Sequence, residues 1–299
     1  METYIGVDLG GTLVRVAKVT RSGEVLEEFI RDSNAQSGPK VVLGNIIEMV
    51  KSISDYQLAK GLGLGIPGPV DTERGVITLA TNLKGFEDYP VAKTLEDALG
   101  MPVFMDNDAN VAGLAEAVVG IGKGNPIVYY ITHSTGIGGA LVVNGKVVSG
   151  KSGYAGEIAN IIVTDNGQKI NHLALGAVEN EASGTALARR AKIEVASDVE
   201  DAKQLFELAQ AGNEKAIALV DDMARKFAQM MAAIAHVADP HMFVIGGGVS
   251  KGHAHYFDKV QAYYNTFVHE GMRDVKVELA SLDQPGVIGA AMLPISYGL

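Results

Sequence analysis

Two aspartates lie where a predicted strand ends, beside a turn or a helix. Asp8 precedes the glycine turn of "DLGGT", and Asp108 lies in "FMDNDAN", between a predicted strand and a predicted helix. Two adjacent glycines allow positive φ and leave the backbone N–H groups of the turn open to a ligand. Such N–H groups bind phosphate, and a carboxylate beside them requires a cation such as Mg²⁺ between the two. Asp108, at the carboxyl end of a strand, is a candidate general base.

Both features also have a plainer interpretation. A Gly-Gly pair is an ordinary β-hairpin signal, and the apolar alternation in "YIGVDLGGTLVRVAKV" fits two paired strands. Asp108 would equally serve as the N-cap of the helix that follows it. The neighbouring Asp106 is expected to be structural. The residues alone leave these alternatives open.

The composition is that of a globular protein and excludes several classes of site. A length of 299 residues favours two domains, and 25 Lys and Arg against 35 Asp and Glu give a net charge of −10. This charge opposes non-specific attraction to nucleic acid or to anionic membranes. Without cysteine, neither disulfides nor thiolate metal sites are possible. We see no signal-peptide pattern and no apolar run near ~20 residues, so we expect a cytoplasmic protein with no membrane or nucleic-acid partner.

A second glycine turn repeats the first one at domain length. Gly138-Gly139 lie 128 positions after Gly10-Gly11, and "GGALVVNGKV" aligns with "GGTLVRVAKV". The repeat predicts two related halves whose glycine turns together would cradle a polyphosphate. Two unrelated hairpins are the alternative. The match of residues 63–68 to G-x-G-x-x-G is not a dinucleotide motif, because Pro67 and Pro69 prevent the helix that this motif must open.

Seven blocks along the chain resemble the ROK family of sugar kinases and repressors. They are "DLGGT" (8–12), "PGPVD" (67–71), "NDANVAGLAE" (107–116), "TGIGGALVVNGKVVSG" (135–150), "AGEI" (155–158), "ENEASGTALARRA" (179–191) and "IGGGVS" (245–250). The resemblance implies an α/β protein with the two-domain, actin-like and ribonuclease-H-like ATPase fold and an active site in the interdomain cleft. We expect a small domain of residues 1–108 plus about 284–299 and a large domain of residues 109–283. The resemblance also favours a homodimer.

The resemblance assigns roles to individual residues. Asp108 is expected to act as the general base toward a sugar hydroxyl. The expected sugar-binding residues are Gly68, Asn82, Asn107, Asp108, Glu157, Asn160 and Glu179. The expected nucleotide-binding residues are Asp8, Gly10, Gly11, Thr12, Thr135, Gly136, Gly138, Gly247 and Gly248. Asp8 would face Mg²⁺ through water or a phosphate, and the last two glycines would let the adenosine lie flat. For Glu157 and Glu179 the plainer interpretation is a solvated surface charge.

Two departures from the family pattern stand out. The family's structural zinc site uses a His shortly after "GE" and a cysteine run, and these positions are Asn160, Ile170, His172 and Ala177 here. A lone histidine does not replace four ligands, so we expect no zinc and a changed wall of the sugar pocket. The Lys that usually follows "GGT" is Leu13 here.

The resemblance implies a kinase that uses ATP and Mg²⁺ to phosphorylate the 6-hydroxyl of a hexose, with glucose as the first expectation. Fructose, an N-acetylated hexosamine, allose and a β-glucoside are alternatives of the same class. A sugar-responsive repressor is a different class; only seven residues before Asp8 and the acidic charge disfavour it. A non-catalytic sugar sensor is a third, disfavoured by the presence of both Asp8 and Asp108.

Overall fold

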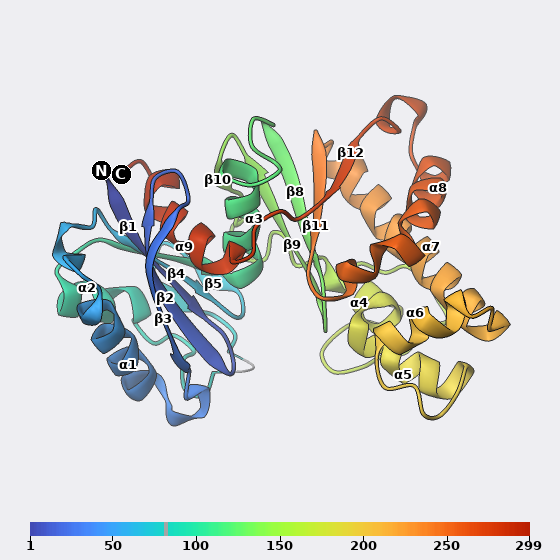
Figure 1. The fold of residues 1–299 in the computed structure, drawn as a ribbon, viewed down its shortest axis with the longest axis horizontal. Coiled ribbons are helices and arrows are strands. Elements are labelled where there is room, and N and C mark those ends of the chain that lie inside the picture. The colour runs from blue at the N-terminus through green and yellow to red at the C-terminus, as the bar shows by residue number, and fades with distance from the viewer. Residues whose placement is uncertain (81–82) are drawn as a thin grey trace. The chain divides into compact units, whose positions relative to one another are not determined.

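The computed structural model describes residues 1–80 and 83–299 (Figure 1). One five-stranded sheet has the order β3-β2-β1-β4-β7. Its strands are β1 (Thr3–Leu9), β2 (Leu13–Thr20), β3 (Val25–Asp32), β4 (Leu62–Ile66) and β7 (Val103–Asn107). The first three strands are antiparallel neighbours, whereas β1, β4 and β7 run parallel. The carboxyl ends of these parallel strands therefore share one edge of the sheet.

A second five-stranded sheet repeats this order as β10-β9-β8-β11-β12. Its strands are β8 (Ile127–His133), β9 (Ile137–Val143), β10 (Lys146–Val147), β11 (Met242–Gly246) and β12 (Lys276–Leu279). The two glycine turns join equivalent strands, β1 to β2 and β8 to β9. The predicted duplication is confirmed by this shared strand order. A small ribbon pairs β5 (Val70–Asp71) with β6 (Val76–Ile77).

The side chains of the first sheet alternate between two faces. Ile5, Val7 and Leu9 of β1 belong to one buried core with α1 (Pro39–Ser52) and α2 (Val91–Leu99). The opposite face of the sheet packs against α3 (Asp108–Val118) and α9 (Pro285–Ser296). Several strand residues on this face are glycines. A Cβ on Gly63 of β4 would lie 1.8 Å from the carbonyl oxygen of Ala290. Gly63, and Gly65, where a Cβ would lie 2.6 Å from Val111 Cγ2 of α3, thus serve helix packing.

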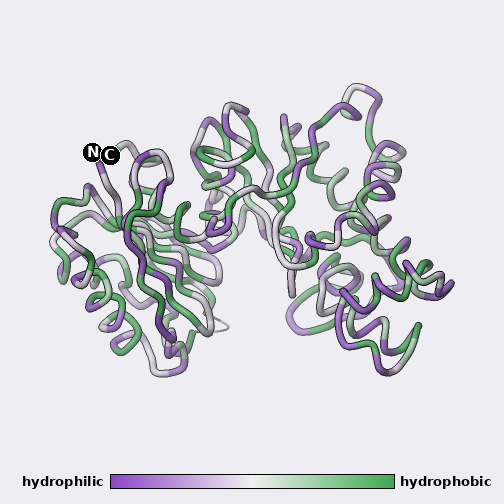
Figure 2. The backbone as a smooth tube through the Cα atoms, in the orientation of Figure 1, coloured by the Kyte–Doolittle hydropathy of each residue, from purple (hydrophilic) through white to green (hydrophobic). Residues whose placement is uncertain are grey.

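The remaining helices follow β10. They are α4 (Val178–Ala182), α5 (Gly184–Glu194), α6 (Ala202–Gln210), α7 (Glu214–Ala238) and α8 (Phe257–Phe267). Short 3₁₀ turns cover 35–37, 56–58, 158–160, 249–255 and 270–272. Along α5 to α8, hydrophobic and hydrophilic residues alternate (Figure 2). None of the helices described for residues 1–80 and 83–299 combines the length and apolar character needed to cross a bilayer.

The chain divides into two compact units. The first comprises Met1–Tyr130, Ala140–Gly156 and Ala280–Leu299, and the second comprises Ile131–Gly139 and Glu157–Leu279. The first division falls after Tyr130, later than the expected boundary at Asp108, and α3 lies in the first unit. Helix α3 belongs to the first unit because it packs closely against α9: a Cβ on Gly289 of α9 would lie 1.7 Å from the carbonyl oxygen of Val111 in α3.

Candidate functional site

In the first unit, Asp8 and Asp108 lie at the same edge of the sheet. Asp8 is aligned with Gly65 of β4, which is aligned in turn with Asp106 of β7, and Asp108 begins α3 directly after β7. The two carboxylates are close enough for the charge of Asp108 to raise the pKa of Asp8. The parallel strands therefore bring together the two aspartates that the sequence singled out.

Asp8 is a half-buried carboxylate that is costly to ionise. Burial, followed by the charge of Asp108, raises its pKa from 3.8 to about 6, although Arg15 acts in the opposite direction. Within the residues described, no donor hydrogen-bonds to this carboxylate. The first turn of α9 approaches it so closely that a Cβ on Gly286 would lie 2.4 Å from Oδ2. A cation bound to Asp8 would relieve both unfavourable effects.

Asn107, not Asp108, is the N-cap of α3. Its Oδ1 accepts a hydrogen bond from the Ala109 N–H at 2.8 Å, and its Nδ2 donates to the Gly68 carbonyl at 3.1 Å. The capping interpretation of Asp108 is therefore wrong, because its neighbour fills that position. A sugar that contacts Asn107, as expected, would have to bind to Oδ1 or Nδ2, and both atoms already form these hydrogen bonds.

Asp108 is solvent-accessible at the first position of α3. Its Oδ1 accepts from the Ala109 N–H at 2.8 Å. Desolvation by the surrounding protein raises its pKa, although backbone hydrogen bonds act against this. A carboxylate with a raised pKa is better suited to accept a proton.

Asp106 has the structural role expected of it. Its Oδ1 accepts from the Asn107 N–H and from Asn110 Nδ2, each at 2.7 Å, and its Oδ2 accepts from Ser149 Oγ at 2.9 Å. Asp106 is almost fully buried, and these three bonds leave it no role toward a ligand.

Gly68 occupies a backbone conformation that favours glycine. Its φ is +98°, and a Cβ would lie 2.4 Å from the Leu79 carbonyl oxygen. Its carbonyl orients Asn107, which places it beside the start of α3. The expected sugar contact Asn82 lies outside the described residues.

The first glycine turn is a hairpin with an open surface. The Gly10 N–H donates to the Leu13 carbonyl at 2.9 Å, and Leu9 pairs with Val14. Neither Gly10 nor Gly11 uses the positive φ that glycine allows. Nothing lies within 4 Å of the position of a Cβ on Gly11, and Thr12 is exposed. The hairpin and the ligand interpretations are thus compatible, because backbone bonds at Gly10 and at the Thr12 carbonyl hold the turn while Gly11 and the Thr12 side chain remain exposed.

The second glycine turn, residues 134–136, is braced by a carboxylate. Glu179 Oε2 accepts from the Ile137 N–H at 2.8 Å, and a Cβ on Gly136 would lie 2.6 Å from the same oxygen. Glu179 is therefore half-buried and bonded, and the interpretation as a solvated charge is wrong. Thr135 is exposed, whereas Gly138 lies within β9 rather than in the turn.

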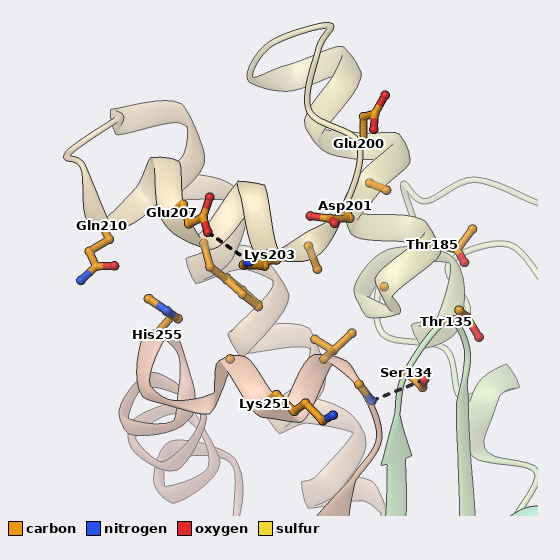
Figure 3. Close-up of a pocket in the computed structure, with 17 residues that line it drawn as sticks. Ser134, Thr135, Thr185, Glu200, Asp201, Lys203, Glu207, Gln210, Lys251 and His255 are labelled. Atoms are coloured by element: carbon orange, nitrogen blue, oxygen red, sulfur yellow. Dashed lines mark hydrogen bonds and ion pairs between the residues drawn. The ribbon is translucent and has the colours of Figure 1, made fainter.

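The two glycines after β11 play different parts. Gly247 has a φ of +93°, and its Cβ would lie 2.4 Å from the His133 carbonyl oxygen, so the β8 backbone occupies its open side. Gly248 lines a cavity of about 890 Å³ in the second unit, together with Thr135 and Thr185 (Figure 3). The other lining residues, such as Phe206, come from α6 and its neighbours. Sequence reasoning missed them, because no motif places α6 near the turn.

The segment in which the resemblance implies a zinc site is held by hydrogen bonds and apolar contacts. Asn160 Oδ1 accepts from the Ala174 N–H at 2.7 Å, and Ala159, Leu173 and Ala177 form a small apolar cluster. Glu157 lies at the start of the same segment and is exposed, as is Asn160. Among the described residues, no group of three or more His, Cys, Asp or Glu could hold a metal ion.

Comparison with known proteins relates this geometry to a family. The sequence profile described as "ROK family" matches residues 4–296. The chain belongs to the ROK family. A relative named "Glucokinase" from Halalkalibacterium halodurans is 33% identical over 97% of this chain and 94% of its own length. Members of the family with solved structures resemble this chain along almost its entire length.

One such structure is the ROK hexokinase from Thermus thermophilus, with a TM-score of 0.88 and 32% identity over 99% of this chain and all of that one. Another is a ROK glucokinase from Streptomyces griseus in complex with glucose and AMPPNP, with a TM-score of 0.78 and 29% identity over 97% of this chain and 98% of that one. The expected family, the two-domain actin-like fold and sugar-kinase activity are confirmed.

Proposed function

We propose that this protein transfers the γ-phosphoryl group of ATP to the 6-hydroxyl of a hexose, with glucose as the first candidate. The observation that carries the proposal is the pair of carboxylates, Asp8 and Asp108, at one sheet edge beside an open glycine turn. The relatives named glucokinase and the structure that holds glucose and AMPPNP support the choice of substrates.

Asp108 acts as the general base in this proposal. Its carboxylate accepts the proton of the sugar hydroxyl as the hydroxyl oxygen attacks the γ-phosphorus. The bond from that phosphorus to the bridging oxygen of ADP breaks, and ADP leaves with the electron pair. The bond from Oδ1 to the Ala109 N–H holds the carboxylate in place during this transfer.

Asp8 fits one ligand of a magnesium ion, held through water or a phosphate. Its carboxylate has no hydrogen-bond donor among the described residues and a pKa raised by burial and by Asp108. Bound magnesium would neutralise the phosphate chain of the nucleotide. A carboxylate oxygen such as those of Asp8 is a ligand that a hard cation prefers, and Asp108 remains free to meet the sugar.

The phosphates are assigned to the two glycine turns, at Gly10, Gly11 and Thr12 and at Thr135 and Gly136, of which Gly11, Thr12 and Thr135 are exposed. The nucleoside is assigned to the cavity that Gly248 and Thr135 line, whose volume of about 890 Å³ is within the range for small-molecule sites. The nucleotide is also assigned to Gly138, which lies within β9, and to Gly247, whose open side faces the β8 backbone.

The sugar is assigned to Gly68, Asn82, Asn107, Asp108, Glu157, Asn160 and Glu179. Carboxylates and amides accept from or donate to paired hydroxyls. Fructose, an N-acetylhexosamine, allose and a β-glucoside remain the alternatives. A sugar-responsive repressor would need a DNA contact, which the charge of −10 disfavours. A homodimer and a cytoplasmic location belong to the same proposal.

The test is a coupled assay of ADP release across a panel of hexoses. We expect turnover that requires both a sugar and Mg²⁺. Asp108→Asn should lower kcat by ~10²–10⁴, because the base is lost, while sugar binding stays measurable by calorimetry. Asp97→Asn, an exposed carboxylate on α2, is the matched control and should leave kcat unchanged. Normal turnover by Asp108→Asn would remove Asp108 from the mechanism.

A further inference from the structure

His133 is a fully buried histidine that directly precedes the second glycine turn. It is the last residue of β8. It does not line the cavity, and it is not among the residues proposed to contact a ligand. Its Nε2 lies 2.8 Å from the Ala182 carbonyl oxygen, and its Nδ1 lies 3.1 Å from the Tyr256 hydroxyl. The ring stacks on Phe227 with centroids 4.6 Å apart. Both ring nitrogens and one ring face are therefore occupied.

These partners determine the tautomer of His133. A backbone carbonyl only accepts, so Nε2 carries the proton and donates it to Ala182. Nδ1 then accepts from the Tyr256 hydroxyl. Burial keeps the ring neutral, because it lowers the pKa of His133 from 6.5 to about 4. The ring thus has one orientation that satisfies all of its partners.

Ala182 belongs to the corner at which α4 ends and α5 begins. The turn residues dock on the same corner, since the Gly184 N–H donates to the Ser134 carbonyl at 2.8 Å and the Thr185 N–H donates to the Thr135 carbonyl at 3.2 Å. On the other side of the turn, Glu179 of α4 accepts from the Ile137 N–H. The corner therefore holds the turn through bonds before, within and after it.

The backbone around the turn is closely packed at two of its carbonyl groups. A Cβ on Gly184 would lie 2.8 Å from the Ser134 carbonyl oxygen, and one on Gly247 would lie 2.4 Å from that of His133. The end of β8 is thus pressed against two neighbouring segments. Loss of the bond to Ala182 would let this strand end rotate and would carry the N–H groups of Thr135 and Gly136 with it.

We propose that His133 is a positioning residue for the nucleotide. Its neutral ring ties the end of β8 to Ala182 and so holds residues 134–136 in the geometry that receives the phosphates. The proposal rests on the proposed function in placing the nucleotide at this turn. His133 itself does not touch the nucleotide.

Three variants test the bond to Ala182. His133→Asn places an amide near the Nδ1 position and loses that bond, whereas His133→Gln places an N–H near the Nε2 position and keeps it. Tyr256→Phe removes only the other bond. We expect His133→Asn to raise the KM for ATP about 10-fold, as for loss of one buried hydrogen bond, with the KM for the sugar changed less than about twofold. His133→Gln and Tyr256→Phe should stay within about threefold of the wild type.

His236→Asn is the matched control, because His236 also contacts a backbone carbonyl, that of Ala232, but at the end of α7. It should leave the KM for ATP unchanged. A fluorescent ATP analogue measures binding directly. Absence of binding by the wild type would refute the proposed function, whereas equal binding by the wild type and a folded His133→Asn would refute the positioning role alone. If His133→Asn does not fold, a tenfold loss of binding by His133→Gln overturns the proposal, and retained binding supports it.

Discussion

At the scale of single residues, the ionised carboxylate of Asp8 is unfavourable for the stability of the ligand-free fold. A half-buried carboxylate with a pKa of about 6, next to a second carboxylate, is charged at neutral pH in surroundings that disfavour the charge. Such a group persists where a ligand relieves the cost. Asp8 therefore weakens the ligand-free fold, and under the proposed function a bound cation would relieve this cost.

Asp8→Asn should stabilise the ligand-free protein while it lowers turnover. We expect the free energy of unfolding at pH 8 to rise by up to about 3 kcal/mol, since one pKa unit corresponds to about 1.4 kcal/mol. In the wild type, the contribution of Asp8 is fully present below pH 3.8 and is lost as the pH rises through 6. Denaturant unfolding at several pH values should therefore show the stabilisation growing between pH 4 and 6. A constant difference across this range would contradict the assigned pKa.

His133 acts in the opposite direction over the same pH range. Its folded pKa of about 4 lies below the usual 6.5, so its contribution is fully present above about 6.5 and is lost as the pH falls toward 4. The two groups offset one another in the wild type. The pH effect of Asp8 is thus visible as a difference between variant and wild type rather than in the wild-type curve.

At the scale of elements, glycines determine how closely the helices approach the first sheet. Positions 6 and 63 in the strands and 289 in α9 lack room for a Cβ, because backbone oxygens lie 1.7 to 2.1 Å from where it would be. This close packing presses α9 and α3 against the strands that carry Asp8 and Asp106. The helices that border the site are therefore positioned by backbone contact.

Gly289→Ala should destabilise the first unit strongly. The new Cβ would overlap the Val111 carbonyl oxygen, so α9 and α3 must move apart, at a cost of about 3 kcal/mol or more. Gly44→Ala in α1, where nothing lies within 4 Å, is the matched control and should stabilise by up to about 1 kcal/mol through helix propensity. Urea unfolding measures both variants. Similar effects of the two substitutions would refute the packing role.

The short helix α4 is stabilised by its tertiary contacts. Five residues do not form a stable helix in isolation. Here Glu179 bonds to Ile137, the Ala182 carbonyl accepts from His133, and Glu181 accepts from Lys226 Nζ of α7 at 2.8 Å and from the Gln168 N–H at 3.3 Å. The second glycine turn thus depends on a helix that itself depends on tertiary contacts.

At the scale of the whole molecule, neither unit is one continuous stretch of chain. The first unit includes residues 280–299. Hydrogen bonds to Glu116 attach the start of this segment to the rest of the unit. This buried carboxylate of α3 accepts from the Ser281 and Leu282 N–H groups, both at 2.9 Å. Gly286 thereby reaches Asp8, which is far away in the sequence. The candidate site therefore requires both ends of the chain.

Removal of metal ions should abolish activity without lowering the stability of the protein. We expect a chelator to abolish ADP release and added Mg²⁺ to restore it, because the phosphate chain needs a cation. The melting temperature without nucleotide should not change, because we expect no structural zinc and the segment is held by hydrogen bonds such as that from the Ala174 N–H to Asn160. Elemental analysis should find no stoichiometric zinc. Tightly bound zinc, or a chelator-induced drop in melting temperature, would contradict this account.

The amino-acid sequence by itself determined the local features. The duplicated strand-turn-strand pattern, the strand ends at Asp8 and Asp108 and the lack of thiolate ligands all follow from short-range backbone preference and residue type. Only the tertiary structure decided which glycines serve packing, that Asn107 caps α3, that Glu179 bonds to Ile137 and that His133 bonds to Ala182. The physical reason is that these roles depend on which distant backbone groups meet a side chain, and that is settled by packing between elements rather than by any local pattern.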